Sequence, residues 1–170
     1  MIRALDIAPA AADAAAEPAT DRVTLDREGR YRRRGVLTTD GGETVLLDLA
    51  EARELDDGAF LLLEDGRRIA VCAAAEPLYA ITAASPQALA RLAWHIGNRH
   101  LPAAIEPGRL LIARDHVVAD MVRRLGGTVA AVVEPFRPEG GAYGHGRTHG
   151  HHAHAHAHDD PNARIPARRG

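Results

Sequence analysis

Seven of the ten histidines in this 170-residue chain lie in one stretch near its C-terminus, GGAYGHGRTHGHHAHAHAH. A neutral imidazole is the commonest metal ligand among side chains. Because no cysteine lies near them, these imidazoles suit Ni(II), Zn(II) and Cu(II) and disfavour Cu(I) and iron–sulfur clusters. The alternation with Ala and Gly gives no fixed scaffold, so the stretch predicts a metal collector with several exchanging modes of coordination. Its histidines are His145, His149, His151, His152, His154, His156 and His158.

An expression tag or a low-complexity end without a task would also be rich in one residue type. A tag is usually an uninterrupted run at a terminus, whereas this tract is broken by Ala and Gly and is followed by DDPNARIPARRG. Metal binding is therefore the favoured interpretation.

His116, in RDHVVADM, is a second candidate ligand outside the tract. The positive end of a helix dipole disfavours imidazolium, so an imidazole in a first turn is available to a metal near pH 7. An ordinary helix-start histidine bonded to the backbone is the alternative. One imidazole is a poor site, but two copies of the chain meeting across a two-fold axis would place both His116 rings on one ion. A flexible segment from Gly144 to His158 spans about 20 Å and could add ligands to such a site.

Catalysis by the Asp115–His116 pair is not favoured, because adjacent helical residues point in different directions and no Ser or Cys nucleophile motif lies nearby. No phosphate-binding Gly-rich loop with Lys occurs, so nucleotide hydrolysis is excluded. His95 and His100 flank a helix end, where His100 is expected to bond a carbonyl or a turn.

The segment GRYRRRG places Arg30, Arg32 and Arg34 on one face of a strand. A solvated sheet edge is the simplest interpretation, and a docking surface for an acidic partner is the alternative.

Composition narrows the function further. A net charge of −2 and 4% aromatic residues argue against nucleic acid or an anionic membrane as the main partner. Cys72 is the only cysteine, so an intramolecular disulfide framework is excluded, and its apolar surroundings predict a small buried side chain. We find no signal peptide and no membrane span, and we expect a cytoplasmic protein.

The first half of the chain predicts a small all-β domain. Short apolar runs are separated by DREG, DGG, DDG and EDG, which read as turns between successive hairpins. An early strand, MIRALDI, precedes an Ala/Pro-rich segment at residues 8–20 that we interpret as a flexible insertion.

The second half predicts strand, helix, strand, strand, helix, strand over Leu78–Phe136, which is the ferredoxin-like order. Ser85 and Pro86 begin the first helix, and Asp115 caps the second. Each helix has an apolar face. These are Leu89, Leu92, Ala93 and Ile96 in the first, and Val117, Val118, Met121, Val122 and Leu125 in the second. The fold class is therefore α+β, with a β-rich domain at 1–76, a ferredoxin-like domain at 77–143 and a disordered tail at 144–170.

Three motifs in order, LARLAWHIGNRHLP, RDHVVADMVRRLGG and EPFRPEGGAYGHGRTHGH, resemble the urease accessory protein E family. That resemblance implies a nickel metallochaperone rather than an enzyme, with a peptide-binding-like β domain before the ferredoxin-like domain. It also implies that His116 binds nickel at a homodimer interface and that His145 or His149 approaches this metal. The implied partners are the urease accessory GTPase, protein G, and the urease apoprotein in its maturation complex. The alternatives are a nickel or zinc buffer without handover, and a peptide-binding or assembly module in which metal is incidental.

Overall fold

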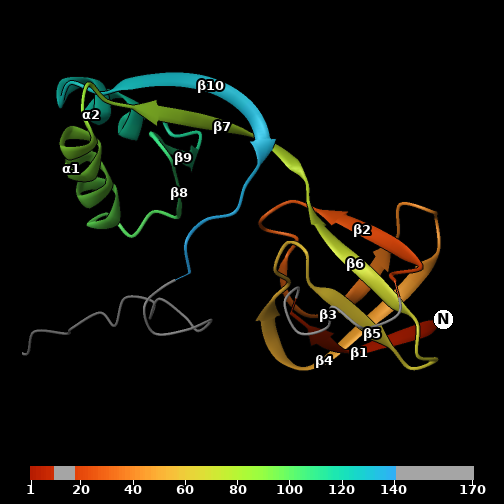
Figure 1. Cartoon of the computed structure of the whole chain (residues 1–170). Coiled ribbons are helices and arrows are strands. Elements are labelled where there is room, and N and C mark those ends of the chain that lie inside the picture. The colour runs from red at the N-terminus through yellow and green to blue at the C-terminus, as the bar shows by residue number, and fades with distance from the viewer. Residues whose placement is uncertain (10–17, 141–170) are drawn as a thin grey trace, which may run out of the picture.

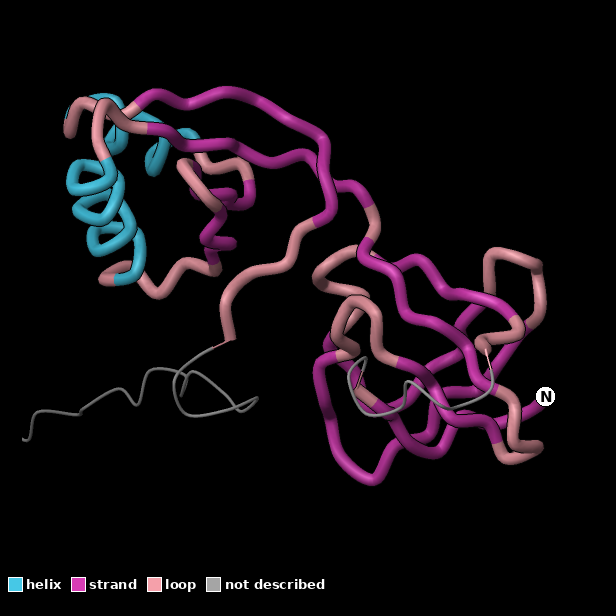
Figure 2. Tube along the Cα trace, viewed as in Figure 1, coloured by secondary structure: helices cyan, strands magenta, loops and turns pink. Residues whose placement is uncertain are grey.

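The computed structural model describes residues 1–9 and 18–140, which form two sheets and two helices. Strands outweigh helices in this part of the chain, and both helices belong to the half that contains the second sheet (Figures 1 and 2). The mixed α+β class is as predicted. The strands of the first sheet are β1 Ile2–Ala8, β2 Asp21–Leu25, β3 Tyr31–Thr38, β4 Thr44–Glu54, β5 Phe60–Leu63 and β6 Arg68–Ala73.

The order of the first sheet, β2-β6-β5-β1-β4-β3, differs from a series of hairpins. DGG at 40–42 and EDG at 64–66 do close the hairpins β3–β4 and β5–β6, where Gly42 and Gly66 adopt positive φ angles of 88° and 87°. DREG and DDG instead join strands that are not neighbours, because β2 pairs in parallel with β6 and β1 in parallel with β4. The prediction of successive hairpins was right at DGG and EDG and wrong at DREG and DDG, since a turn signal fixes only where the chain reverses and not which strand lies beside it.

One apolar core lies inside this sheet. Its fully covered members come from every strand and include Ala4, Val23, Leu37, Leu47, Leu61 and Ile69. The two edge strands approach each other, because Thr24 in β2 donates hydrogen bonds from its backbone N–H and its hydroxyl to Asp40 beyond β3. The sheet therefore curls around its own core (Figure 1).

The second sheet has the order β10-β7-β9-β8, with every neighbouring pair antiparallel. Its elements follow the predicted order of strand, helix, strand, strand, helix, strand. They are β7 Ala75–Thr82, α1 Pro86–Gly97, β8 Ala103–Glu106, β9 Arg109–Ala113, α2 His116–Arg124 and β10 Thr128–Pro135.

Both helices begin at the predicted caps. The Ser85 hydroxyl accepts from the Ala88 N–H at 3.2 Å, and the Asp115 carboxylate accepts from Val117 and Val118. The helices pack on one face of the sheet, where Leu92, Ile96, Val118 and Val122 join Ile81, Leu110 and Ile112 in a single core. Val117 departs from prediction: 59% of it is exposed, because α2 turns this residue away from the sheet.

The opposite face of this sheet is covered by the chain that follows β10. Phe136 is 1% exposed and packs with Leu78, Ala80, Ala104 and Leu111, and the backbone N–H of Glu139 then donates to the Ala103 carbonyl at 2.9 Å. Residues 136–139 therefore cross beneath the sheet from β10 to the edge strand β8. Within the described residues, neither helix is long and apolar enough to cross a membrane.

Candidate metal centre

His116 is the first residue of α2, and its side chain is exposed. The other seven predicted ligands, His145, His149, His151, His152, His154, His156 and His158, lie outside the described residues. Among residues 1–9 and 18–140, no group of three or more His, Cys, Asp or Glu side chains is arranged to hold a metal ion. A site at His116 therefore needs ligands from the tail or from a second copy of the chain.

The backbone that carries His116 is held by its neighbour in sequence. Both hydrogen bonds of the Asp115 cap are made by one carboxylate oxygen, Oδ1, which accepts from Val117 at 2.8 Å and from Val118 at 3.1 Å. These bonds satisfy backbone N–H groups that have no partner inside the helix. The Asp115 carboxylate is thus part of the helix start, as predicted.

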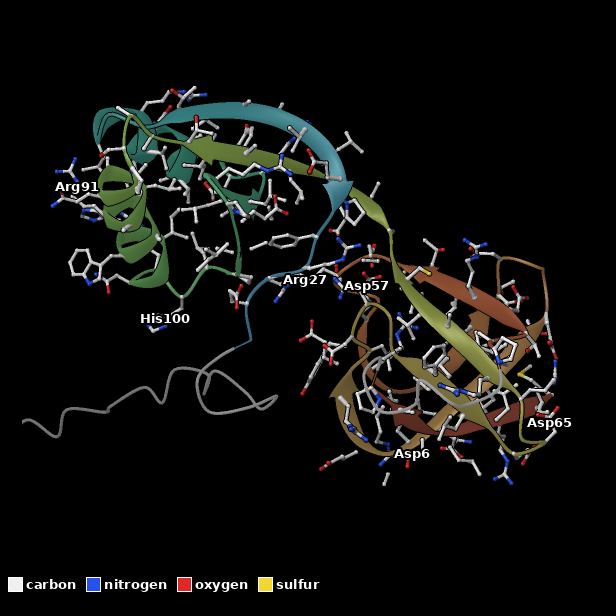
Figure 3. The ribbon with its side chains drawn as sticks, viewed as in Figure 1. Asp6, Arg27, Asp57, Asp65, Arg91 and His100 are labelled. Atoms are coloured by element: carbon white, nitrogen blue, oxygen red, sulfur yellow. The ribbon has the colours of Figure 1, made fainter. Side chains whose placement is uncertain are left out.

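The other two described histidines lie at the end of α1. His95 is half-buried, and its ring meets the edge of the Trp94 ring with centroids 4.9 Å apart. His100 is exposed beyond the helix, in the left-handed region with φ of 55°, and its backbone N–H donates to the Gly97 carbonyl (Figure 3). The expected turn at His100 is present, made by its backbone.

A hollow of about 470 Å³ lies between the end of α1 and the exposed side of α2. His95 and Arg99 line it from α1 and the turn that follows, and Val117, Met121 and Arg124 line it from α2. We did not predict this hollow from the sequence. The available sequence signal was Trp94, a large apolar residue outside the predicted apolar face of α1. In the structure, 63% of Trp94 is exposed.

Arg30 does not lie where the sequence pattern predicted. We predicted it on an exposed strand face with Arg32 and Arg34, but Arg30 precedes β3 and is only 2% exposed. Its guanidinium donates a hydrogen bond to the Phe136 carbonyl and lies 4.0 Å from the Glu54 carboxylate. A buried guanidinium needs such partners, and one of them, the Phe136 carbonyl, comes from a segment more than 100 residues away in the chain.

Asp57 makes a second link between the first sheet and the segment after β10, in addition to the hydrogen bond from Arg30 to Phe136 (Figure 3). Its carboxylate accepts from the backbone N–H of Ala73 at 2.6 Å and from the guanidinium of Arg137 at 2.5 Å. Burial by itself raises the pKa of Asp57, but the hydrogen bonds from Ala73 and Arg137 outweigh this effect and hold its pKa below the ordinary value. The charged carboxylate is therefore the form that the fold favours.

Cys72 is half-buried in β6, so its side chain is less covered than the predicted small buried side chain.

Two family models match nearly the whole described chain. Residues 4–74 match the N-terminal domain of the UreE urease accessory protein, and residues 76–160 match its C-terminal domain. Relatives named urease accessory protein UreE include one from Ruegeria sp. (strain TM1040), 54% identical over 133 residues that cover 78% of this chain and 74% of the relative. One from Ruegeria pomeroyi is 55% identical over 132 residues, covering 78% of this chain and 87% of the relative. One from Rhizobium meliloti is 54% identical over 129 residues, covering 76% of this chain and 83% of the relative. The chain therefore belongs to the UreE urease accessory protein family.

Proposed function

We propose that this chain is a nickel-binding metallochaperone, which captures Ni(II) at a histidine site between two copies of itself and delivers it for assembly of the urease metallocentre. Membership of an accessory-protein family supports a part in urease maturation, and a member of that family is not itself an enzyme. The observation that carries the metal site is the exposed His116 on a capped helix start.

The surroundings of His116 suit a shared site. The adjacent Val117 exposes 59% of its surface, and an exposed apolar residue beside a ligand is what a contact with a second copy would cover. A two-fold axis beside α2 would bring two His116 rings together, and closed two-fold dimers are the commonest homo-oligomers. His145 or His149 of the tail would then complete the ligand set, with His151, His152, His154, His156 and His158 as a collector.

A set of imidazoles fits the task of transfer. Neutral imidazole binds Ni(II) and also accepts Zn(II) or Cu(II), so the nickel preference rests on the family rather than on the ligands. Monodentate ligands can be replaced one at a time, which lets the ion pass to a partner without being released. The receiving partners in this proposal are the accessory GTPase, protein G, and the urease apoprotein in the cytoplasm.

In this proposal the three segments of the chain have different roles. Residues 1–76 form a peptide-binding-like domain, residues 77–143 bind metal and dimerise, and residues 144–170 supply the further histidines.

Nickel titration with native mass measured at each step tests this proposal. The full chain should bind nickel as a dimer, and a chain ending at Tyr143 should keep about one ion per dimer through His116. His116→Ala in that shortened chain should abolish binding, whereas His100→Ala, which changes another exposed histidine of the same domain, should not. Full nickel stoichiometry in the shortened His116→Ala protein would contradict the proposed site.

A metal buffer is the second candidate, favoured by the seven clustered histidines. In a buffer the tail does all the binding, so the chain ending at Tyr143 would lose essentially all its nickel. The same shortened chain therefore separates the two functions.

A further inference from the structure

Three exposed arginines on the helical face have no carboxylate partner among the described residues, as is also true of Arg32 and Arg33 in β3. Elsewhere, arginines such as Arg3, Arg34, Arg53 and Arg109 face carboxylates. Arg91, Arg99 and Arg124 form no ion pair with any described residue, and all three are exposed. This face is therefore locally basic in a chain whose net charge is −2.

These arginines surround the hollow between α1 and α2. Arg99 and Arg124 line it, and the Arg99 Nε donates to the sulfur of Met121 at 3.1 Å. Arg91 points outward from α1 and donates to the Leu125 carbonyl at the end of α2 (Figure 3). The acidic side chain in the hollow, Asp120, is already paired with Arg123 at 2.9 Å. Positive charge around the hollow is consequently not neutralised by the described chain.

Trp94 adds an apolar anchor to this basic face. It is 63% exposed, and its ring touches His95, which lines the hollow. Exposed tryptophan together with arginine is the combination enriched at the centres of protein interfaces. Small-molecule sites enclose most of their ligand, whereas here an aromatic ring stands open to solvent beside the hollow.

The positive charge of this face indicates which kind of partner can bind it. Two copies of this face would bring like charges together, which disfavours self-association through Arg99 and Arg124. Along α2, Val117, which the proposed dimer contact would cover, lies beside His116, and Arg124 lies at the other end of the hollow; these eight residues of helix span roughly 12 Å. A partner bound at the basic end would thus lie close to the proposed nickel ligand.

We propose that Trp94, Arg99 and Arg124 form a docking surface for an acidic protein segment of the nickel-receiving complex. This inference rests on the proposed function, because it places the receiving protein next to His116. The carboxylates of that segment would pair with Arg99 and Arg124 while an apolar side chain packs on Trp94.

The test uses the nickel-loaded full chain and, as probe, nickel-free urease purified together with its other accessory proteins and immobilised on a sensor. Arg99→Glu with Arg124→Glu should weaken binding about tenfold or more, and should flatten its dependence on salt, because the attractive charge pairs are replaced by repulsive ones. Trp94→Ala should weaken binding without changing the salt dependence. The matched control is Arg22→Glu with Arg33→Glu, which makes the same charge change at exposed residues of the first sheet.

Nickel stoichiometry, dimer mass and thermal unfolding of each variant are measured alongside. The proposal requires all three to be unchanged in Arg99→Glu with Arg124→Glu while probe binding falls. Dissociation of the dimer by these substitutions would assign the surface to a second copy and overturn the proposal. Equal loss in the control, or no loss in either protein, would also overturn it. If the wild type holds nickel at His116 but does not bind the probe, the docking surface is refuted while nickel capture stands.

Discussion

Removing the Asp115 cap should weaken nickel binding through the start of α2. In Asp115→Ala, the N–H groups of Val117 and Val118 lose an acceptor that lies 2.8 and 3.1 Å away. Loss of an N-cap costs about 1 kcal/mol, which for a chain of this size lowers the melting temperature by about 2–4 °C. Because His116 is the first helical residue, the same fraying reduces the population in which its ring is held in place.

The size of the functional effect follows from this cost. About 1 kcal/mol corresponds to a change of about fivefold in an equilibrium constant. The nickel affinity of the chain ending at Tyr143 should therefore fall by up to about fivefold for each His116 that the dimer supplies to the site. The assay is isothermal titration with nickel, paired with thermal unfolding of the metal-free protein.

Two control variants separate the cap from other effects. Asp115→Asn keeps a capping oxygen and removes only the charge, so it should retain most of the affinity. Ser85→Ala removes the cap of α1, whose bond to Ala88 is 3.2 Å long, and should lower stability without changing nickel affinity. If Asp115→Ala lowers the melting temperature as expected but leaves nickel affinity at the level of Ser85→Ala, then the helix start does not position His116 and the reasoning is refuted.

Three further outcomes are expected. Phe136→Ala should destabilise the fold by about 3–5 kcal/mol, because a side chain that is 1% exposed is removed from beneath the second sheet; a loss below about 1 kcal/mol in urea unfolding would contradict its place in that core. Asp57 contributes stability that is fully present above its ordinary pKa of 3.8 and is lost as the pH falls through its lower folded pKa, so Asp57→Asn should flatten the acid side of the stability curve, as read from melting temperatures across that range. Nickel affinity of the full chain should fall steeply as the pH drops through the imidazole range near ~6.5, because protons compete for the ligand nitrogens; equal affinities on either side of that range would rule out histidine ligation.

Local interactions explain what the sequence determined by itself. The two helices begin at Ser85 and Asp115 because each cap depends on residues within three positions, and the hairpin turns at Gly42 and Gly66 depend on a backbone conformation that glycine adopts easily. The clustering of histidines needs no structure to be seen. The order of elements in the second half followed from these local signals, and so did the candidate ligand His116.

Only the tertiary structure decided which distant segments meet. The parallel pairings of β1 and β2, the burial of Arg30 against Phe136 and the exposure of Val117 depend on contacts between residues far apart in the chain, which no local pattern encodes. The basic hollow is a further example: Arg99 and Arg124 lie 25 positions apart, in segments whose spacing says nothing about distance, and packing of α1 and α2 on one face of the sheet brings them to its rim. Charge at a surface is a property of that packing, because a side chain's neighbours in space decide whether its charge is neutralised.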